Sequence, residues 1–194
     1  VFDDKFEDAQ YKEAYEIASR LVELNNDDID LQLLKTRAAI KVNQYAEAKE
    51  FKDENPGLIA GIPREETGLY EQLDALKNNF DRELKIREAE AAADDLPRVE
   101  LETSNGKIVI ELFENEAPDT VGNFISLVEG GFYDGILFHR VKKGFMAQAG
   151  GFSMRGPQIV NYTIYDELDS DNLRRHFRGT ISMAKVPGEP DSAS

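Results

Sequence analysis

The sequence predicts an α+β protein with two modules, an N-terminal helical module followed by a β-rich module. Apolar residues recur at helical spacing up to about residue 95 and alternate with polar residues after it. Glycine is scarce in the first part and frequent after residue 104. The formal net charge is −11 over residues 1–95 and −4 over residues 96–194. We place the boundary near Pro97, because proline cannot donate to a helix and biases the residue before it towards extended backbone.

The helical module contains an internal repeat. The tetrapeptide YKEA at 11–14 recurs as YAEA at 45–48, an offset of 34 residues. Helices are predicted at 11–24, 29–42 and 45–52, joined by short turns. The period and the small Ala14 and Ala48 resemble the tetratricopeptide repeat, a helix–turn–helix unit. We therefore predict tetratricopeptide-like helical hairpins over residues 1–62; an ordinary helical hairpin with a chance match is the alternative.

A long connecting helix is predicted over residues 63–95. Pro63 suits the first turn of a helix. One apolar stripe then follows at steps of three and four residues: Leu69, Leu73, Leu76, Phe80 and Leu84. Packing of this stripe against the repeat helices is favoured over a coiled-coil seam.

Short strands separated by glycine-rich turns are predicted in the second half. Residues 99–103 and 107–113 alternate around Asn105-Gly106, a strong hairpin signal. A helix is predicted from Pro118 to Gly130, and further strands at 136–141, 145–149 and 180–184. Short strands with one interposed helix favour a barrel or sandwich over a βαβ sheet.

Composition excludes several classes of function. The chain has no cysteine and only two histidines, so thiolate and multi-histidine metal centres are excluded. The net charge of −15 argues against a nucleic-acid partner. Its apolar runs fall short of the ~18 residues of a membrane span, so we expect no membrane partner. We expect a soluble protein, in the cytoplasm or exported if an upstream signal has been lost.

The densest candidate site spans residues 138–148. Strand alternation places Phe138 and Arg140 on one face of one strand, and Met146 and Gln148 on one face of the next. Arginine stays protonated at usable pH and no carboxylate lies within the run, so acid–base chemistry is disfavoured. An apolar surface beside a permanent donor instead suits an extended peptide.

These residues carry a resemblance to the cyclophilins, which are peptidyl-prolyl cis–trans isomerases. FHRV at 138–141 and GFMAQ at 144–148 resemble the signature of that family. Supporting matches are GKIVIEL at 106–112, APDTVGNF at 117–124, GFYDG at 131–135 and GTISMA at 179–184. The resemblance covers residues 96–194 and implies a closed antiparallel barrel capped by helices, here C-terminally incomplete.

The resemblance also implies a set of site residues. The catalytic arginine falls on Arg140, and the proline pocket falls on Phe145 and Met146. Three further substrate contacts fall on Gln148, Ala184 and Lys185, the last where the family often has Asn or Arg. Lys142-Lys143 replaces a turn that commonly contains proline, and Ala149 and Gly151 depart from the usual residues. No metal or cofactor is called for.

The expected activity is isomerisation of Xaa-Pro bonds in client proteins, which would assist their folding. The chain ends where the family continues into further strands, so we read it as a fragment and expect it to be poorly stable or inactive by itself. The alternative is a non-catalytic binding or scaffolding protein that holds Pro-containing segments in the barrel groove. A protein partner on the helical module fits either function.

Overall fold

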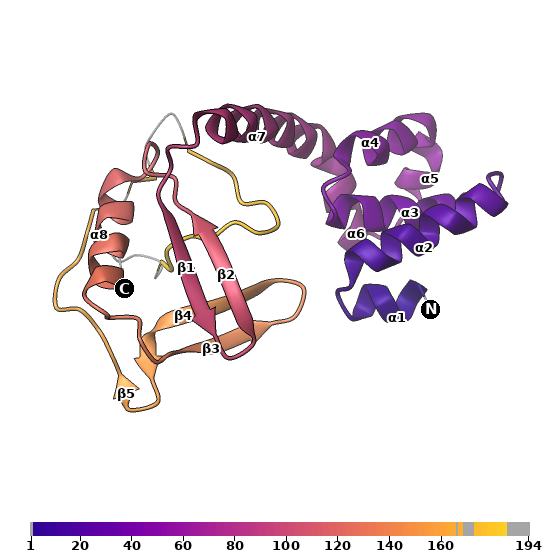
Figure 1. Ribbon diagram of the computed structural model, residues 1–194. Helices are drawn as coiled ribbons and strands as arrows, with labels where there is room; N and C mark the ends of the chain where they lie inside the picture. Colours follow the sequence, from indigo (N-terminus) through magenta and orange to yellow (C-terminus); the bar gives the residue numbers. More distant parts are fainter. Residues whose placement is uncertain (1, 166, 169–172, 186–194) are drawn as a thin grey trace. The chain divides into compact units, whose positions relative to one another are not determined.

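The computed structural model describes residues 2–165, 167–168 and 173–185, except for the side chains of 64–66. The chain divides into two compact units, residues 1–86 and residues 87–194. The first unit holds helices α1 (Phe2–Glu7), α2 (Tyr11–Leu24), α3 (Ile29–Lys41), α4 (Tyr45–Glu54), α5 (Pro56–Ala60) and α6 (Arg64–Glu71), and α7 (Leu73–Ala93) continues into the second (Figure 1). Among the described helices, none combines the length and apolarity needed to cross a bilayer.

The 34-residue repeat is visible in the backbone of the first unit. Ala9 and Asn43, 34 residues apart, both have positive φ, at 55° and 66°. The next residue in each repeat donates back into the preceding helix: Gln10 N lies 2.8 Å from the carbonyl oxygen of Lys5, and Gln44 N lies 2.9 Å from that of Ala39. The α1–α2 hairpin therefore repeats the end of α3 and the start of α4. The three predicted helices are confirmed, and α1 is an addition to them.

Small side chains allow the repeat helices to approach closely. Ala14, Ala38 and Ala48 are fully buried, and Ala18 is 1% exposed. Phe2 of α1 forms one core cluster with Ala14, Ala18 and Ala38, and Phe6 and Leu34 pack against it. The burial of Ala14 and Ala48 at equivalent positions is compatible with the tetratricopeptide-like prediction.

The prediction of one continuous helix over 63–95 is wrong, because the segment forms two helices, α6 and α7, with a break at Gln72. Gln72 has φ −89° and ψ −3°, and its carbonyl accepts the first hydrogen bond of α7, from Leu76 N at 2.8 Å. On either side of this break, Tyr70 and Leu73 are almost fully enclosed. The apolar stripe is only partly buried: Phe80 packs edge-on against Tyr45 at 5.4 Å, whereas Leu69 and Leu84 are about 40% exposed.

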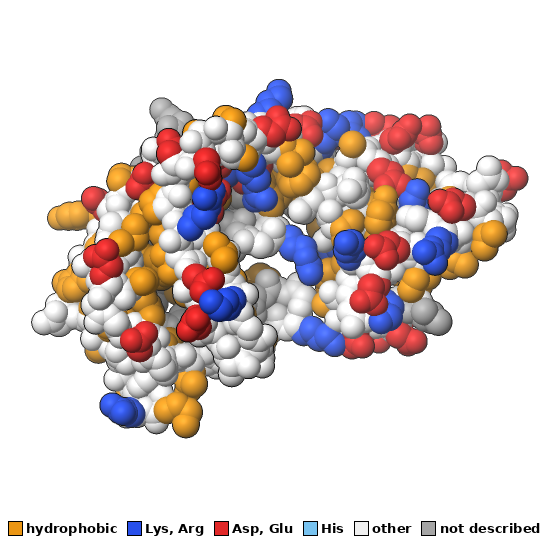
Figure 2. All heavy atoms as spheres, viewed as in Figure 1, with side chains coloured by type: hydrophobic (Ala, Val, Ile, Leu, Met, Phe, Trp, Pro, Cys, Tyr) orange, Lys and Arg blue, Asp and Glu red, His pale blue; other side chains and the backbone are white. Residues whose placement is uncertain are grey.

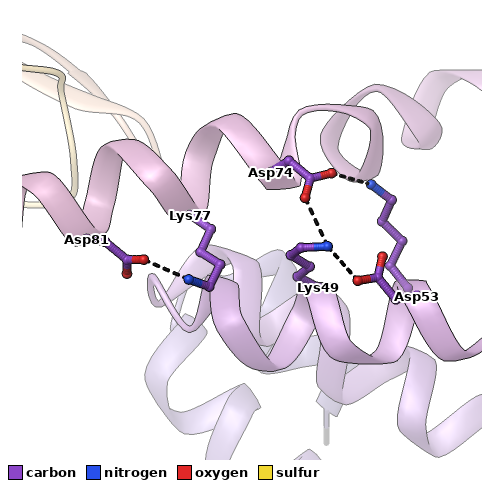
Figure 3. A network of polar contacts seen from close by, with 6 residues as sticks. Lys49, Asp53, Asp74, Lys77 and Asp81 are labelled. Carbon is purple, nitrogen blue, oxygen red and sulfur yellow. Dashed lines mark hydrogen bonds and ion pairs between the residues drawn. The ribbon is translucent and has the colours of Figure 1, made fainter.

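Ion pairs hold α4 against the first turns of α7 (Figure 3). Asp74 accepts from Lys49 at 2.9 Å and from Lys52 at 3.2 Å, and Lys49 also pairs with Asp53 on its own helix. Hydrogen bonds from the two lysines hold the pKa of Asp74 below its usual value. Because these groups are exposed to solvent, the network orients the helices more than it stabilises them.

In the described part of the second unit, two separate antiparallel sheets and helix α8 follow the end of α7. β1 (Arg98–Thr103) pairs with β2 (Gly106–Glu111), and β3 (Ile136–Lys142) pairs with β4 (Met146–Ser153), which also pairs with the short β5 (Gly156–Pro157). Gly106, which pairs with Thr103 directly after the Ser104-Asn105 loop, has φ 124°, a conformation that glycine adopts without a steric cost. Helix α8 (Pro118–Glu129) lies between the sheets in sequence and ends at Gly130, as predicted.

Three predictions for this unit are not met in full by the described residues. The described strands form open sheets of two and three strands, so the closed barrel is not confirmed. Residues 180–184 are described but form no strand, because no described strand pairs with them, and a strand requires a hydrogen-bonded neighbour. The predicted strand at 145–149 starts one residue later and extends to Ser153.

A non-helical segment, residues 158–165 with Glu167, forms hydrogen bonds at three places along α8 and just beyond its end. We call this segment the strap. The side-chain amide of Gln158 donates to the carbonyl of Phe132, just beyond the helix, and Tyr162 donates to Asn123 at 2.7 Å. The Glu167 carboxylate accepts from both the backbone N–H and the hydroxyl of Thr120, at 2.9 and 2.6 Å, and from Asp119 N. Residue 117, the N-cap of α8, is an alanine without a side-chain acceptor, so Glu167 supplies that acceptor from the strap.

Arg174 forms a buried charged cluster with residues from two distant segments. Its guanidinium lies 2.5 Å from Glu90 of α7 and 3.7 Å from Glu116, and it covers the ring of Phe113 at 3.7 Å. The arginine side chain is only 6% exposed. One cation thus serves two largely buried carboxylates, and one oxygen of each lacks a hydrogen-bond partner among the described residues.

Candidate functional site

The β3–β4 hairpin brings three of the predicted site residues to one face. In its register Arg140 lies opposite Gln148, and Lys142 lies opposite Met146. Directly opposed residues of an antiparallel pair share a face, as do alternate residues of one strand. Arg140, Met146 and Gln148 therefore share one face of the sheet, together with Lys142.

A tight turn sets this register. Phe145 N donates to the carbonyl of Lys142 at 3.0 Å, which closes a four-residue turn, and Gly144 at its third position has φ 70°. A type II turn requires positive φ at that position, which glycine adopts without a steric cost. The turn thus aligns the pair Lys142–Met146 and, one step further, the pair Arg140–Gln148.

The hairpin is irregular at its other end. Phe138 pairs with Ala149 while Arg140 pairs with Gln148, so β3 carries one extra residue, His139, between the two pairs. A second irregularity follows in β4 at Gly150 and Gly151, both with positive φ. Bulges of this kind re-aim side chains. Simple alternation, which predicts that Phe138 and Arg140 share a face, therefore does not extend through His139.

The guanidinium of Arg140 is available for a ligand. Arg140 is exposed, and among the described residues it forms no ion pair. Two other arginines of the unit are committed to acidic partners: Arg98 binds Asp94 and Glu111 at 2.6 and 2.8 Å, and Arg174 is buried against Glu90. Asp94 and Glu111 raise the pKa of Arg98 further.

The predicted apolar contacts lie at the turn and beside it. Phe145 is at the turn and 78% exposed, whereas Met146 is partly buried on the face of Arg140. The structure thus brings Met146 beside the arginine and leaves Phe145 at the open end of the hairpin. Ala184 and Lys185 lie outside the hairpin, in the exposed stretch that follows Thr180.

Sequence reasoning missed Lys142 as a member of this face. Strand alternation carries the signal, since Lys142 stands two residues after Arg140. His139, for which we favour a structural role over a catalytic one, contacts the ring of Phe152 with centroids 4.9 Å apart. Within the described part of the chain, no three acidic or histidine side chains gather at a spacing that would hold a metal.

The hairpin thus presents on one face an arginine without an ion pair among the described residues, an amide and a thioether. Residues 98–194 match the sequence model of the family described as cyclophilin type peptidyl-prolyl cis-trans isomerase/CLD. The chain belongs to this family. The match covers half of the chain, and the first 97 residues lie outside it.

Curated relatives agree with the family match. The chain is 46% identical over 104 residues to peptidyl-prolyl cis-trans isomerase A of Dickeya dadantii, covering 53% of each protein. It is 44% identical over 98 residues to the isomerase cyp18 of Streptomyces antibioticus, covering 50% of this chain and 57% of the relative. It is 41% identical over 101 residues to the isomerase ppi1 of Schizosaccharomyces pombe, covering 50% of this chain and 64% of the relative.

The chain covers between 53% and 64% of the length of these three relatives. No solved structure matches it.

Proposed function

We propose that the protein catalyses cis–trans isomerisation of Xaa-Pro bonds in polypeptides and thereby assists their folding. One observation carries the proposal: an exposed arginine, without an ion pair among the described residues, shares a sheet face with Met146 and Gln148 in a member of a prolyl isomerase family. Arg140 is the proposed catalytic residue, and Phe145 and Met146 are the proposed proline contacts. Gln148, Ala184 and Lys185 are the proposed further contacts with the peptide.

The chemistry requires a group that binds a twisted amide better than a planar one. The planar amide is held by donation of the nitrogen lone pair into the carbonyl, and rotation has a barrier of ~18–20 kcal/mol. At the twisted midpoint the lone pair returns to the prolyl nitrogen, which then accepts a hydrogen bond. A guanidinium aimed at this nitrogen stabilises the transition state and leaves the ground state almost unaffected, as catalysis demands.

The contribution of Arg140 can be bounded. A hydrogen bond to a charged group contributes about 1.5–3 kcal/mol, and each ~1.4 kcal/mol changes a rate tenfold. Arg140 therefore supplies about one to two powers of ten. The remainder comes from apolar contacts to the proline ring, which orient it and displace the water that favours the polar planar amide.

The test is an exchange measurement on the full-length protein with a short Ala-Pro peptide, by NMR exchange spectroscopy. We expect catalysed exchange, and Arg140→Ala is expected to lower kcat/KM by about 10- to 100-fold. Arg155→Ala is a matched control, because Arg155 is also exposed but lies in the turn between β4 and β5. Uncatalysed exchange at high protein concentration would rule out the enzyme.

The second candidate function is a binding or scaffolding protein that holds Pro-containing segments without turnover. The helical unit supports it, because repeat hairpins present surfaces to partner proteins. A hollow lined by Lys52, Ile59, Tyr70 and neighbouring residues lies between α4, α5 and α6 of that unit. Tight binding of the peptide that Arg140→Ala leaves unchanged, without accelerated exchange, would favour this function.

A further inference from the structure

The sheet that carries the proposed site has a charge opposite to that of the protein. Residues 135–165, which include β3, β4 and β5, contain no aspartate or glutamate and four basic residues, Arg140, Lys142, Lys143 and Arg155. The chain as a whole carries −15. Acidic side chains are visible over both units (Figure 2). A local excess of +4 is therefore set in an acidic protein.

Two of these cations share the face of the proposed site. Arg140 and Lys142 are alternate residues of β3, about 7 Å apart along the strand at ~3.3 Å per residue. They lie opposite Gln148 and Met146 in the register. A peptide whose proline lies against Met146 therefore passes within reach of two positive charges, and only one of them is assigned to the isomerisation step.

Lys142 has no acidic partner among the described residues, and in this respect it differs from Lys107 on the other hairpin. Lys107 pairs with Glu100 at 2.6 Å and with Glu102 at 3.2 Å, and these carboxylates raise its pKa. No ion pair of the described residues includes Lys142 or Arg140, and no carboxylate lies in the sequence from 135 to 165. The charge of Lys142 is thus free to act on a ligand.

We propose that this face selects client segments with an anionic side chain within about three residues of the isomerised proline. The proposal rests on the proposed function and names its substrate class. The anion is a carboxylate or a phosphorylated hydroxyl, since both satisfy an ammonium beside a guanidinium. Lys142 is the specificity residue, and Arg140 remains the catalytic one.

Screening by salt determines which charges of the protein act on the bound peptide. The Debye length is about 8 Å at physiological salt, so acidic residues that lie farther than this from the bound peptide are largely screened from it. Lys142, about 7 Å from Arg140 along the strand, lies within this range. Charges that lie beyond this range therefore affect the bound peptide less than Lys142 does. An ion pair that is exposed to solvent contributes little free energy. We therefore expect kcat/KM to be about three- to tenfold higher for a peptide with an anionic side chain than for one with a neutral side chain.

The test uses the full-length protein and a set of Ala-Pro peptides with Glu, Gln, Lys or phosphoserine at each of the three positions on either side of the bond. We expect kcat/KM to rank Glu above Gln above Lys at one position or more. A higher kcat/KM for phosphoserine than for Glu at that position would identify the phosphate as the better anion. A higher kcat/KM for Glu would identify the carboxylate. Raising the salt from 0.15 to 0.5 M is expected to reduce the preference.

Two matched variants locate the effect. Lys142→Gln is expected to reduce the Glu-to-Gln ratio of kcat/KM to about one, whereas Arg155→Gln, which removes the same charge at the other end of β4, is expected to keep it. Equal ranking of Glu, Gln and Lys at every position would overturn the proposal, as would a preference that survives Lys142→Gln. Failure of the proposed function is a different result, because no peptide in the set would then isomerise faster than in buffer.

Discussion

Gln10 and Gln44, 34 residues apart, have the same backbone conformation, with φ −83° and ψ 57° in one and φ −82° and ψ 56° in the other. Each precedes a helix that begins with tyrosine, and each follows a residue with positive φ. Sequence similarity at this offset is limited to a few residues, whereas the corner geometry is repeated closely. The repeat is therefore a property of the backbone corner as much as of the helix faces.

The two corners give the first prediction. An L-residue in the left-handed region costs about 1–2 kcal/mol, and asparagine tolerates it better than alanine. Ala9→Gly is therefore expected to raise the free energy of unfolding by about 1 kcal/mol, and Asn43→Gly by less. Urea unfolding followed by circular dichroism measures both. A larger gain from Asn43→Gly would contradict this account of the corners.

The second prediction concerns the buried alanines at the contacts between the repeat helices. Ala48 is fully buried, so Ala48→Leu forces extra volume into a packed interface and is expected to lower the free energy of unfolding by about 1–3 kcal/mol. Ala46 is exposed on the same helix, and Ala46→Leu is expected to change it by less than about 0.5 kcal/mol. Equal effects of the two variants would show that Ala48 is not an obligatory close contact.

Arg174 gives the third prediction. Arg174→Met keeps the volume of the side chain but leaves Glu90 and Glu116 buried without a counterion. Removing one partner of a buried charged group costs about 3–5 kcal/mol. Arg175, the next residue, is exposed, and Arg175→Met is expected to be nearly neutral. The two variants are compared by thermal unfolding, and Arg174→Met is expected to have the lower melting temperature. Similar melting temperatures would show that the cluster does not stabilise the fold.

The fourth prediction concerns pH and the strap. Burial alone would raise the pKa of Glu167, but its hydrogen bonds from Thr120 and Asp119 outweigh burial and lower it. A carboxyl with a lowered pKa in the folded state contributes stability above its unfolded pKa of about 4.3, and loses it as pH falls through the folded value. The backbone amide signal of Thr120, followed by NMR, is expected to shift over that acidic range.

The control for this titration is Glu167→Gln. Glutamine keeps an acceptor oxygen but does not titrate, so the acid-range shift of the Thr120 amide is expected to disappear. A Thr120 amide that titrates equally in both proteins would mean that another carboxylate is responsible.

Local pattern was sufficient to predict much of the fold. Helices α2, α3 and α4 and both hairpins were predictable because each depends on neighbours within a few residues, such as the alternation around Asn105-Gly106. The break at Gln72 was not predictable, because the apolar stripe runs through it without interruption.

Long-range contacts set the limit for the rest. The hydrogen bond between Thr120 and Glu167 joins residues 47 positions apart, and the one between Arg174 and Glu90 joins residues 84 positions apart. Neither carries a local signal. In the site, alternation places Arg140, Met146 and Gln148 correctly on one face, whereas the extra residue at His139 cannot be read from spacing. The closed barrel was expected from resemblance, and the described strands leave both sheets open.

The Arg174–Glu90 separation has a consequence during protein synthesis. The contacts of the first unit join neighbouring helices, so it can fold once about residue 86 has left the ribosome. Arg174 leaves the ribosome 88 residues later, which takes about 4–18 s at ~5–20 residues per second. Through that interval the Glu90 carboxylate lacks the Arg174 guanidinium that it binds in the folded unit. The nascent chain can therefore carry a folded first unit while the second unit still lacks Arg174.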